Sequence, residues 1–131
     1  MITRKTLMWA LCLALAALAW NTVSAHEVVT LHVLGPGASH HYARVWVVDA
    51  KPYVWIRAET PERNWLEPLR ASPDIYLWRG EQRYAYRAAI RDDLASVDFV
   101  DELFRAKYGL MDRLREPFRA KPIIPIQLEP R

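Results

Sequence analysis

Residues 42–73, YARVWVVDAKPYVWIRAETPERNWLEPLRASP, contain the local signals that decide the fold. Two runs, Tyr42–Val48 and Tyr53–Ala58, are rich in β-branched and aromatic residues, and residues 49–52 between them are turn formers. β-Branched and aromatic side chains fit the pleated surface of a strand. The stretch therefore predicts a β-hairpin with a short loop.

The second run of this hairpin has two chemically different faces. Because side chains alternate along a strand, one face is aliphatic and the other is aromatic and ends in a guanidinium. The aliphatic face consists of Val54, Ile56 and Ala58, and the other of Tyr53, Trp55 and Arg57. We expect the aliphatic face to lie in the core.

The chain then turns at Thr60-Pro61 into a predicted short helix, Glu62–Ala71. Helix N-termini and arginines hold anions, and indoles cover flat rings, so a ligand with a ring and an anionic tail would suit this place. The alternative is that Trp55 and Trp65 are ordinary core or rim aromatics and that Arg57 is a solvated strand end.

The first 25 residues have the pattern of a secretory signal peptide. Arg4 and Lys5 precede an uncharged apolar run, Leu7–Trp20, and Val23-Ser24-Ala25 offers a cleavage site. The run is shorter than the roughly 20 residues that a membrane-spanning helix needs. We expect cleavage after Ala25, no stable membrane insertion afterwards, and a periplasmic or secreted protein whose residues 26–131 form one domain.

The composition argues against several functional classes. Two of the 18 basic residues and none of the 15 acidic residues lie in the leader, so the rest of the chain is nearly neutral and no nucleic-acid partner is expected. The only cysteine, Cys12, also lies in the leader, which leaves no disulfide and no thiolate ligand. The histidines cluster, but His40 and His41 are adjacent and would point to opposite faces of a strand, so we predict no metal site.

The remaining strands are predicted from alternation and turn residues. A first strand is expected at Glu27–Leu34, before a Gly-Pro loop, and two antiparallel strands at Ile75–Trp78 and Arg83–Ile90. A closing strand is expected at Ile123–Leu128, and its prolines at 122 and 125 place it at a sheet edge or a bulge.

A long helix is predicted between the last two strands, with Ser96 as its N-cap and Pro117 at its end. Tyr108-Gly109 is expected to kink or divide it. The apolar stripe comprises Val97, Val100, Leu103, Phe104, Leu110, Met111 and Leu114. Six strands and two helices in this order predict an α+β fold, a small closed or half-closed antiparallel barrel with helices packed on it.

Arginines are the most informative polar residues, because the sequence contains no nucleophile motif and no glycine-rich phosphate loop before a helix. Arg44 lies in the first half of the hairpin, Arg57 ends the second half, and Arg63 starts the predicted helix. They would converge on one phosphate if their strands are neighbours. The alternative is that they cover the polar rim of a barrel.

Three short motifs resemble those of a known superfamily. Gly37-Ala38-Ser39 leads into a strand with Arg44, Asn64-Trp65-Leu66 begins a helix that exits at Pro73, and Ile124–Pro130 closes the chain. This layout, over about residues 28–130, resembles the split β-barrel flavin-binding proteins, which include pyridoxamine phosphate oxidases. It is most similar to the deazaflavin-dependent nitroreductase and quinone-reductase group, although the loop at 35–41 lacks that group's basic run.

The resemblance implies a six-stranded antiparallel split β-barrel with two helices that binds FMN or a deazaflavin, and a homodimer with the cofactor at the subunit interface. It implies that phosphate is held by Ser39, His40 and Arg44 with help from Arg57 and Asn64, and that Trp55 or Trp65 flanks the ring. The implied function is that of an exported oxidoreductase-like protein of nitroreductase or quinone-reductase type. The alternative is a non-catalytic periplasmic barrel that binds a small aromatic or phosphorylated ligand, or a protein partner, through an aromatic and arginine-rich face.

Overall fold

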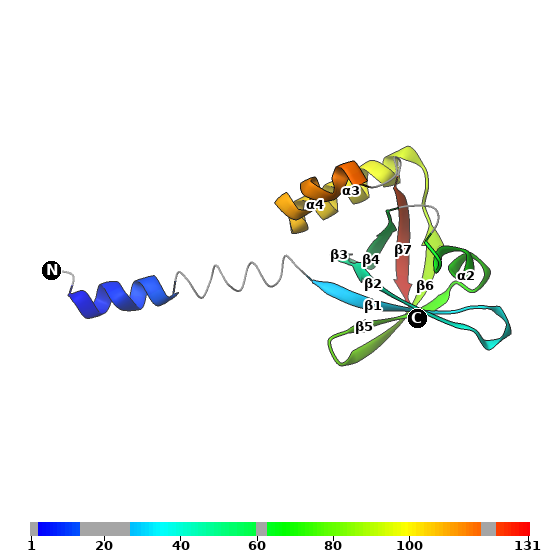
Figure 1. Cartoon of the computed structure of the whole chain (residues 1–131), viewed down its shortest axis with the longest axis horizontal. Coiled ribbons are helices and arrows are strands. Elements are labelled where there is room, and N and C mark those ends of the chain that lie inside the picture. Colours follow the sequence, from blue (N-terminus) through cyan, green and yellow to red (C-terminus); the bar gives the residue numbers. More distant parts are fainter. Residues whose placement is uncertain (1–2, 14–26, 60–62, 119–122) are drawn as a thin grey trace.

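The computed structural model describes residues 3–13, 27–59, 63–118 and 123–131. Residues 4–13 form an exposed helix (Figure 1). The predicted cleavage site after Ala25 and the predicted turn at Thr60-Pro61 lie outside the described residues. Within the described ranges, no helix is both long and apolar enough to cross a membrane.

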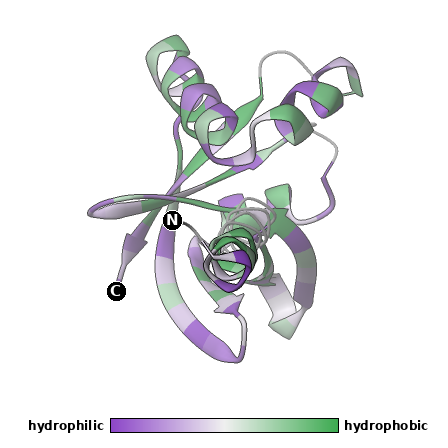
Figure 2. Cartoon of the chain, turned by 90° about the vertical axis from the view of Figure 1, so that its left-hand side faces the viewer, coloured by the Kyte–Doolittle hydropathy of each residue, from purple (hydrophilic) through white to green (hydrophobic). Residues whose placement is uncertain are grey.

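Seven antiparallel strands form a single sheet in the order β2-β1-β5-β6-β7-β4-β3. Seen from the side in Figure 2, the sheet curls into an open half-barrel below a pair of helices. The α+β class is confirmed, but the predicted count of six strands is wrong. The strands are β1 (Val28–Leu34), β2 (His40–Trp46), β3 (Val48–Ala50), β4 (Tyr53–Ala58), β5 (Asp74–Arg79), β6 (Gln82–Ile90) and β7 (Ile124–Pro130).

The additional strand arises because Val47 divides the run Tyr42–Val48. Before Val47, β2 pairs with β1, where Trp46 faces Val28; after it, β3 pairs with β4, where Val48 faces Trp55. The predicted hairpin therefore consists of β3 and β4 alone. A single residue thus connects the two opposite edges of the sheet, so the barrel is joined at this end.

Both faces of β4 are buried. Val54, Ile56 and Ala58 lie in the main core inside the curled sheet, as predicted. Trp55 belongs to a second core between the sheet and helix α3 (Leu94–Tyr108). Because every residue from Val54 to Ala58 is buried, this strand is fixed from both sides.

The closing strand β7 lies in the middle of the sheet, between β6 and β4, so the predicted edge position is wrong. Pro125 is tolerated there because it lies beyond the last pair with β6, Ile90–Ile126. Its carbonyl accepts a hydrogen bond from the Arg91 N–H at 3.0 Å, and the ladder requires no donor from residue 125 at this point.

Helix α2 (Leu66–Ala71) begins four residues later than predicted, so Asn64 and Trp65 precede it. Pro68 explains the shift: proline lacks an N–H and clashes with the carbonyl four residues earlier, which confines it to the first turn of a helix. Helix α3 begins earlier than predicted. Asp93, and not Ser96, is its N-cap and accepts a hydrogen bond from the Ser96 N–H at 3.0 Å.

Gly109 divides the long helix, as predicted, and adopts a φ of 53° that favours glycine. Helix α4 (Leu110–Arg115) and the short 3₁₀ turn Glu116–Phe118 follow. The continuous apolar stripe predicted across the break is wrong. Leu110 and Leu114 are exposed, and the residue that α4 buries is Asp112.

Candidate functional site

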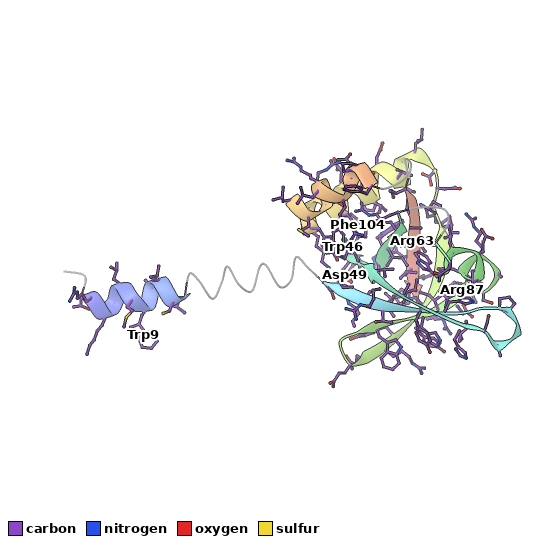
Figure 3. All side chains as sticks on the ribbon, in the orientation of Figure 1. Trp9, Trp46, Asp49, Arg63, Arg87 and Phe104 are labelled. Atoms are coloured by element: carbon purple, nitrogen blue, oxygen red, sulfur yellow. The ribbon has the colours of Figure 1, made fainter. Side chains whose placement is uncertain are left out.

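A cavity of about 330 Å³ opens at the split, between β2 and β4. Arg44 comes from β2, Arg57 from β4, Arg63 from the segment before α2, and Arg115 from the end of α4. The other lining side chains that matter here are Glu59, Asn64, Trp46, Trp65 and Phe104. In Figure 3, Trp46, Arg63 and Phe104 gather where the helix pair meets the sheet. The volume lies within the usual range of small-ligand pockets.

Arg57 is the buried centre of this cavity. Its side chain is 2% exposed, it forms a salt bridge of 3.1 Å with Asp101, and it pairs closely with Asp112, whose side chain is equally buried. The guanidinium carbon also lies 4.2 Å from the centre of the Phe104 ring. Among the described residues, the Arg57 Nε finds no acceptor, so one buried donor remains for another group.

Arg44 contributes the second available cation. Even-numbered side chains of β2 point to the outer face of the sheet, and Arg44 is exposed beside the cavity. Within the described ranges, no carboxylate lies within salt-bridge distance of it. An anion at the split would therefore meet one exposed and one buried guanidinium.

Glu59 pairs with the other two arginines and offsets one of their two charges. Its Oε2 lies 3.2 Å from Arg115 Nη2 and 3.7 Å from Arg63 Nη2. Arg115 in turn lies over the Trp46 ring at 4.7 Å, and Tyr108 stacks on the same indole at 4.3 Å. The most accessible aromatic side chain of the cavity is thus covered by an arginine that Glu59 holds.

The joined end of the barrel is held by a polar cluster beneath the cavity. The Val47 N–H donates to the Tyr108 hydroxyl at 3.0 Å, and Lys107 Nζ donates to the Val47 carbonyl at 2.7 Å. Glu27 accepts from Lys107 at 2.6 Å and from Arg79 at 2.9 Å. Burial would raise the pKa of Glu27, but hydrogen bonds from Lys107 and Arg79 lower it overall. Glu27 therefore stays ionised and fixes β1 to α3 and β5.

The structure brings together four of the seven candidate residues. Arg44, Arg57, Asn64 and Trp65 all line the cavity. The other three lie elsewhere. Ser39 and His40 sit at the β1–β2 turn, which points away from α3 and α4 in Figure 1, and Trp55 lies under α3 against Phe99.

Two residues that line the cavity, Glu59 and Arg115, and the Arg57 partner Asp112 were not identified from the sequence. Glu59 follows Arg57 by two positions and so continues the same face of the chain, and this was a readable signal. No local pattern indicated Asp112 or Arg115, because their partners, Arg57 and Glu59, lie more than fifty residues away in the sequence. Nor did periodicity indicate that α4 turns a carboxylate inward.

A second group of polar and aromatic side chains lies on the outer face of the sheet. His32 Nε2 and His40 Nδ1 lie 2.9 Å apart, and Tyr42 stacks on His32 at 4.4 Å. Arg83 covers Tyr76 at 4.4 Å. Tyr42 is 60% exposed and Trp78 is 38% exposed. No group of three or more metal-ligating side chains exists in the part of the chain that the structure describes.

Comparison with known proteins identifies the fold. No family model and no curated protein matches the sequence. Among solved structures, an F420-H2-dependent reductase (FDR-A) has a TM-score of 0.63 at 14% identity, covering 79% of this chain and 95% of its own. A FAD-binding protein from Mesorhizobium loti has a TM-score of 0.58 at 12% identity, covering 88% and 87%. The heme storage protein HutZ from Vibrio cholerae has a TM-score of 0.61 at 9% identity, covering 88% and 89%. At these identities the likeness is one of fold, and the resemblance read from the sequence motifs is confirmed at that level.

Proposed function

We propose that this chain, which has the fold of the split-barrel flavin-binding proteins, binds a phosphorylated flavin-type ligand in the cavity at the split. FMN and a deazaflavin are the two ligands that the sequence motifs favour. The protein is then an oxidoreductase-like protein of the nitroreductase or quinone-reductase type. The observation that carries the proposal is the buried Arg57, whose Nε lacks an acceptor among the described residues in a cavity lined by three further arginines.

The residues fit the anionic part of such a ligand. Arg44 has no carboxylate partner among the described residues, and the buried Arg57 offers an N–H that needs an acceptor. Charge-assisted contacts with phosphate are short and strong because the guanidinium presents fixed donors. Asn64 adds an amide, and Trp46, which lies under Arg115, is the least buried aromatic side chain of the cavity. A bound flavin would supply electron or hydride transfer, whereas the chain supplies binding and orientation.

Two flavins that differ by one phosphate test this proposal. Purified protein is titrated with FMN and with riboflavin, and tryptophan quenching reports binding. Arg44→Ala removes an exposed cavity cation and should weaken FMN by about 1.5–3 kcal/mol, the usual strength of a hydrogen bond to a charged group. Riboflavin, which has no phosphate, should be nearly unaffected.

The matched control is Arg87→Ala, which removes an exposed β6 arginine that pairs with Asp74 away from the cavity. It should change neither affinity. Wild-type protein that binds neither flavin at high micromolar concentration would refute the proposal. So would an Arg44→Ala variant that weakens both flavins equally, because the effect would then not depend on phosphate.

We also propose that the protein works outside the cytoplasm, because its first 25 residues have the composition of a signal peptide. N-terminal sequencing of material from the periplasm or medium should begin at His26. An intact Met1 in that fraction would refute the proposal.

A second candidate function is supported by the outer face of the sheet. Tyr42 and Trp78 are exposed there beside Arg83, and tyrosine, tryptophan and arginine are enriched at the energetic centres of protein interfaces. The chain would then be a non-catalytic barrel that binds a partner, such as a second copy of itself. Colourless purified protein whose sedimentation shows a dimer, lost on Tyr42→Ser, would favour this candidate. Bound flavin absorbance would favour the first.

A further inference from the structure

The Glu59 carboxylate occupies a place that suits the anionic group of a ligand. It lies between Arg63 and Arg115 inside the cavity, and its side chain is only 16% exposed, whereas the two arginine side chains are 45% and 44% exposed. The acid is therefore turned inward while its partners reach toward solvent. An ordinary surface salt bridge leaves the carboxylate in water.

We propose that Glu59 is an internal competitor that sets the charge of the ligand accepted by the cavity. This inference rests on the proposed function, in which an anionic group enters the split. While Glu59 pairs with Arg63 and Arg115, Arg44 and the Nε of Arg57 are the cavity donors that have no acidic partner among the described residues. A ligand gains the Arg63 and Arg115 nitrogens that face Glu59 only if its own negative charge displaces the carboxylate.

The competition distinguishes ligands by charge. A neutral ring offers nothing to Arg63 and Arg115 and leaves the Glu59 pairs in place. A phosphate has more charge than a carboxylate and accepts several hydrogen bonds at once, so it can replace Glu59 at both guanidinium groups. Displacement of Glu59 also breaks its salt bridge with Arg115. That salt bridge holds the Arg115 guanidinium over the Trp46 ring. Glu59 thus weakens every anionic ligand and leaves neutral ligands unchanged.

The test replaces the charge and keeps the shape. Glu59→Gln should bind FMN about tenfold more tightly than wild type and riboflavin within twofold, both measured by calorimetry. The matched control is Glu67→Gln, which removes a carboxylate that lies 3.3 Å from Arg70 on α2, outside the cavity. It should change neither affinity. Because Arg63 and Arg115 are nearly half exposed, the thermal midpoint of Glu59→Gln should stay close to that of wild type.

A double variant shows whether Glu59 acts through its arginine partner. In an Arg115→Ala background, the gain in FMN affinity from Glu59→Gln should fall below threefold. A gain that stays near tenfold would show that Glu59 repels the ligand at long range and does not compete for Arg115. Equal FMN affinities of wild type and Glu59→Gln would overturn the inference, as would equal gains for FMN and riboflavin.

Inorganic pyrophosphate separates this inference from the proposed function. If no flavin binds either protein, but pyrophosphate binds Glu59→Gln about tenfold more tightly than wild type, the flavin proposal fails and the role of Glu59 stands. If neither flavins nor pyrophosphate bind either protein, both are refuted.

Discussion

Removing the guanidinium of Arg57 should destabilise the fold far more than removing a comparable exposed arginine. Arg57 and Asp112 have side chains that are each 2% exposed, and they fix α4 to β4. At an effective dielectric constant of about 20, an ion pair at the 3.1 Å separation of Arg57 and Asp101 attracts with about 5 kcal/mol. Most of that attraction offsets the desolvation of the charges. Arg57→Ala removes the attraction to Asp101 and also one partner of the buried Asp112, and breaking a buried pair in this way costs about 3–5 kcal/mol.

Arg87→Ala is the matched comparison, because Arg87 also extends from a strand and also has an aspartate at 3.1 Å. Its side chain is 66% exposed, so its pair with Asp74 should contribute only about 0–1 kcal/mol. Equilibrium urea denaturation measures both variants. With a slope of about 2 kcal/mol per M, the midpoint should fall by about 1.5–2.5 M for Arg57→Ala and by less than about 0.5 M for Arg87→Ala.

Equal midpoints for the two variants would refute the reasoning, since burial would then not govern the strength of the pair. A double variant, Arg57→Leu with Asp112→Leu, provides the complementary test. Replacing both charges of a buried pair by apolar side chains is often neutral or stabilising. The double variant should therefore be more stable than Arg57→Ala, and a still lower midpoint would show that the pair itself contributes net stability.

Three further predictions concern stability and pH. Val54→Asp places a carboxylate in the main core and should lower the free energy of unfolding by several kcal/mol. Lys51→Ala, in the exposed β3–β4 turn, should shift the urea midpoint very little. Similar midpoints for the two variants would show that the faces of the hairpin are misassigned. Tyr108→Phe removes the hydroxyl that contacts Val47 and should cost about 1–3 kcal/mol. Because burial raises the pKa of Tyr108, absorbance at 295 nm should show that this phenol ionises only on alkaline unfolding. Burial lowers the pKa of His32, and the nearby His40 and Arg83 lower it further, so the unfolded chain binds this proton at higher pH than the folded chain does. Stability should therefore fall as the pH drops below about 6.5, and His32→Gln should reduce the difference between urea midpoints at pH 7.5 and 5.5; an unchanged difference would contradict this assignment.

Local chemistry was readable in the sequence because it acts over a few residues. The alternation of β4, the antiparallel pair β5–β6 and the break at Gly109 all follow from side-chain period and turn residues. The late start of α2 was readable too, since Pro68 confines the helix start, although the apolar spacing suggested an earlier one. Arg44 and Arg57 were identified from a hairpin that β2 and β4 do not form, and they meet because the curled sheet brings its two edges together at Val47. Trp65 lines the cavity but is buried in the main core, as the alternative interpretation expected.

Long-range pairing could not be predicted in this way. Nothing in the sequence near Ile124 indicates that β7 lies between β6 and β4. That position depends on pairing with strands that are distant in the sequence. The orientation of α4 is set by Arg57, a residue more than fifty positions away, and a carboxylate inside a charged helix looks solvated in the sequence alone. Glu59 and Arg115 are also more than fifty positions apart in the sequence, so their salt bridge could not be predicted from local patterns. The charges of the cavity could be assigned only from the structure.

Val47 is the single residue that joins the two edge strands of the sheet, β2 and β3. β2 pairs with β1 along its whole length and β4 pairs with β7, so each side of the split is held within the sheet and Val47 is the covalent link between the two sides. The Tyr108 hydroxyl accepts a hydrogen bond from the Val47 N–H, and Lys107 Nζ donates one to the Val47 carbonyl. Helix α3 therefore fixes the link between the two sides of the cavity, and we expect substitutions of Tyr108 or Lys107 to change ligand affinity although neither residue lines the cavity.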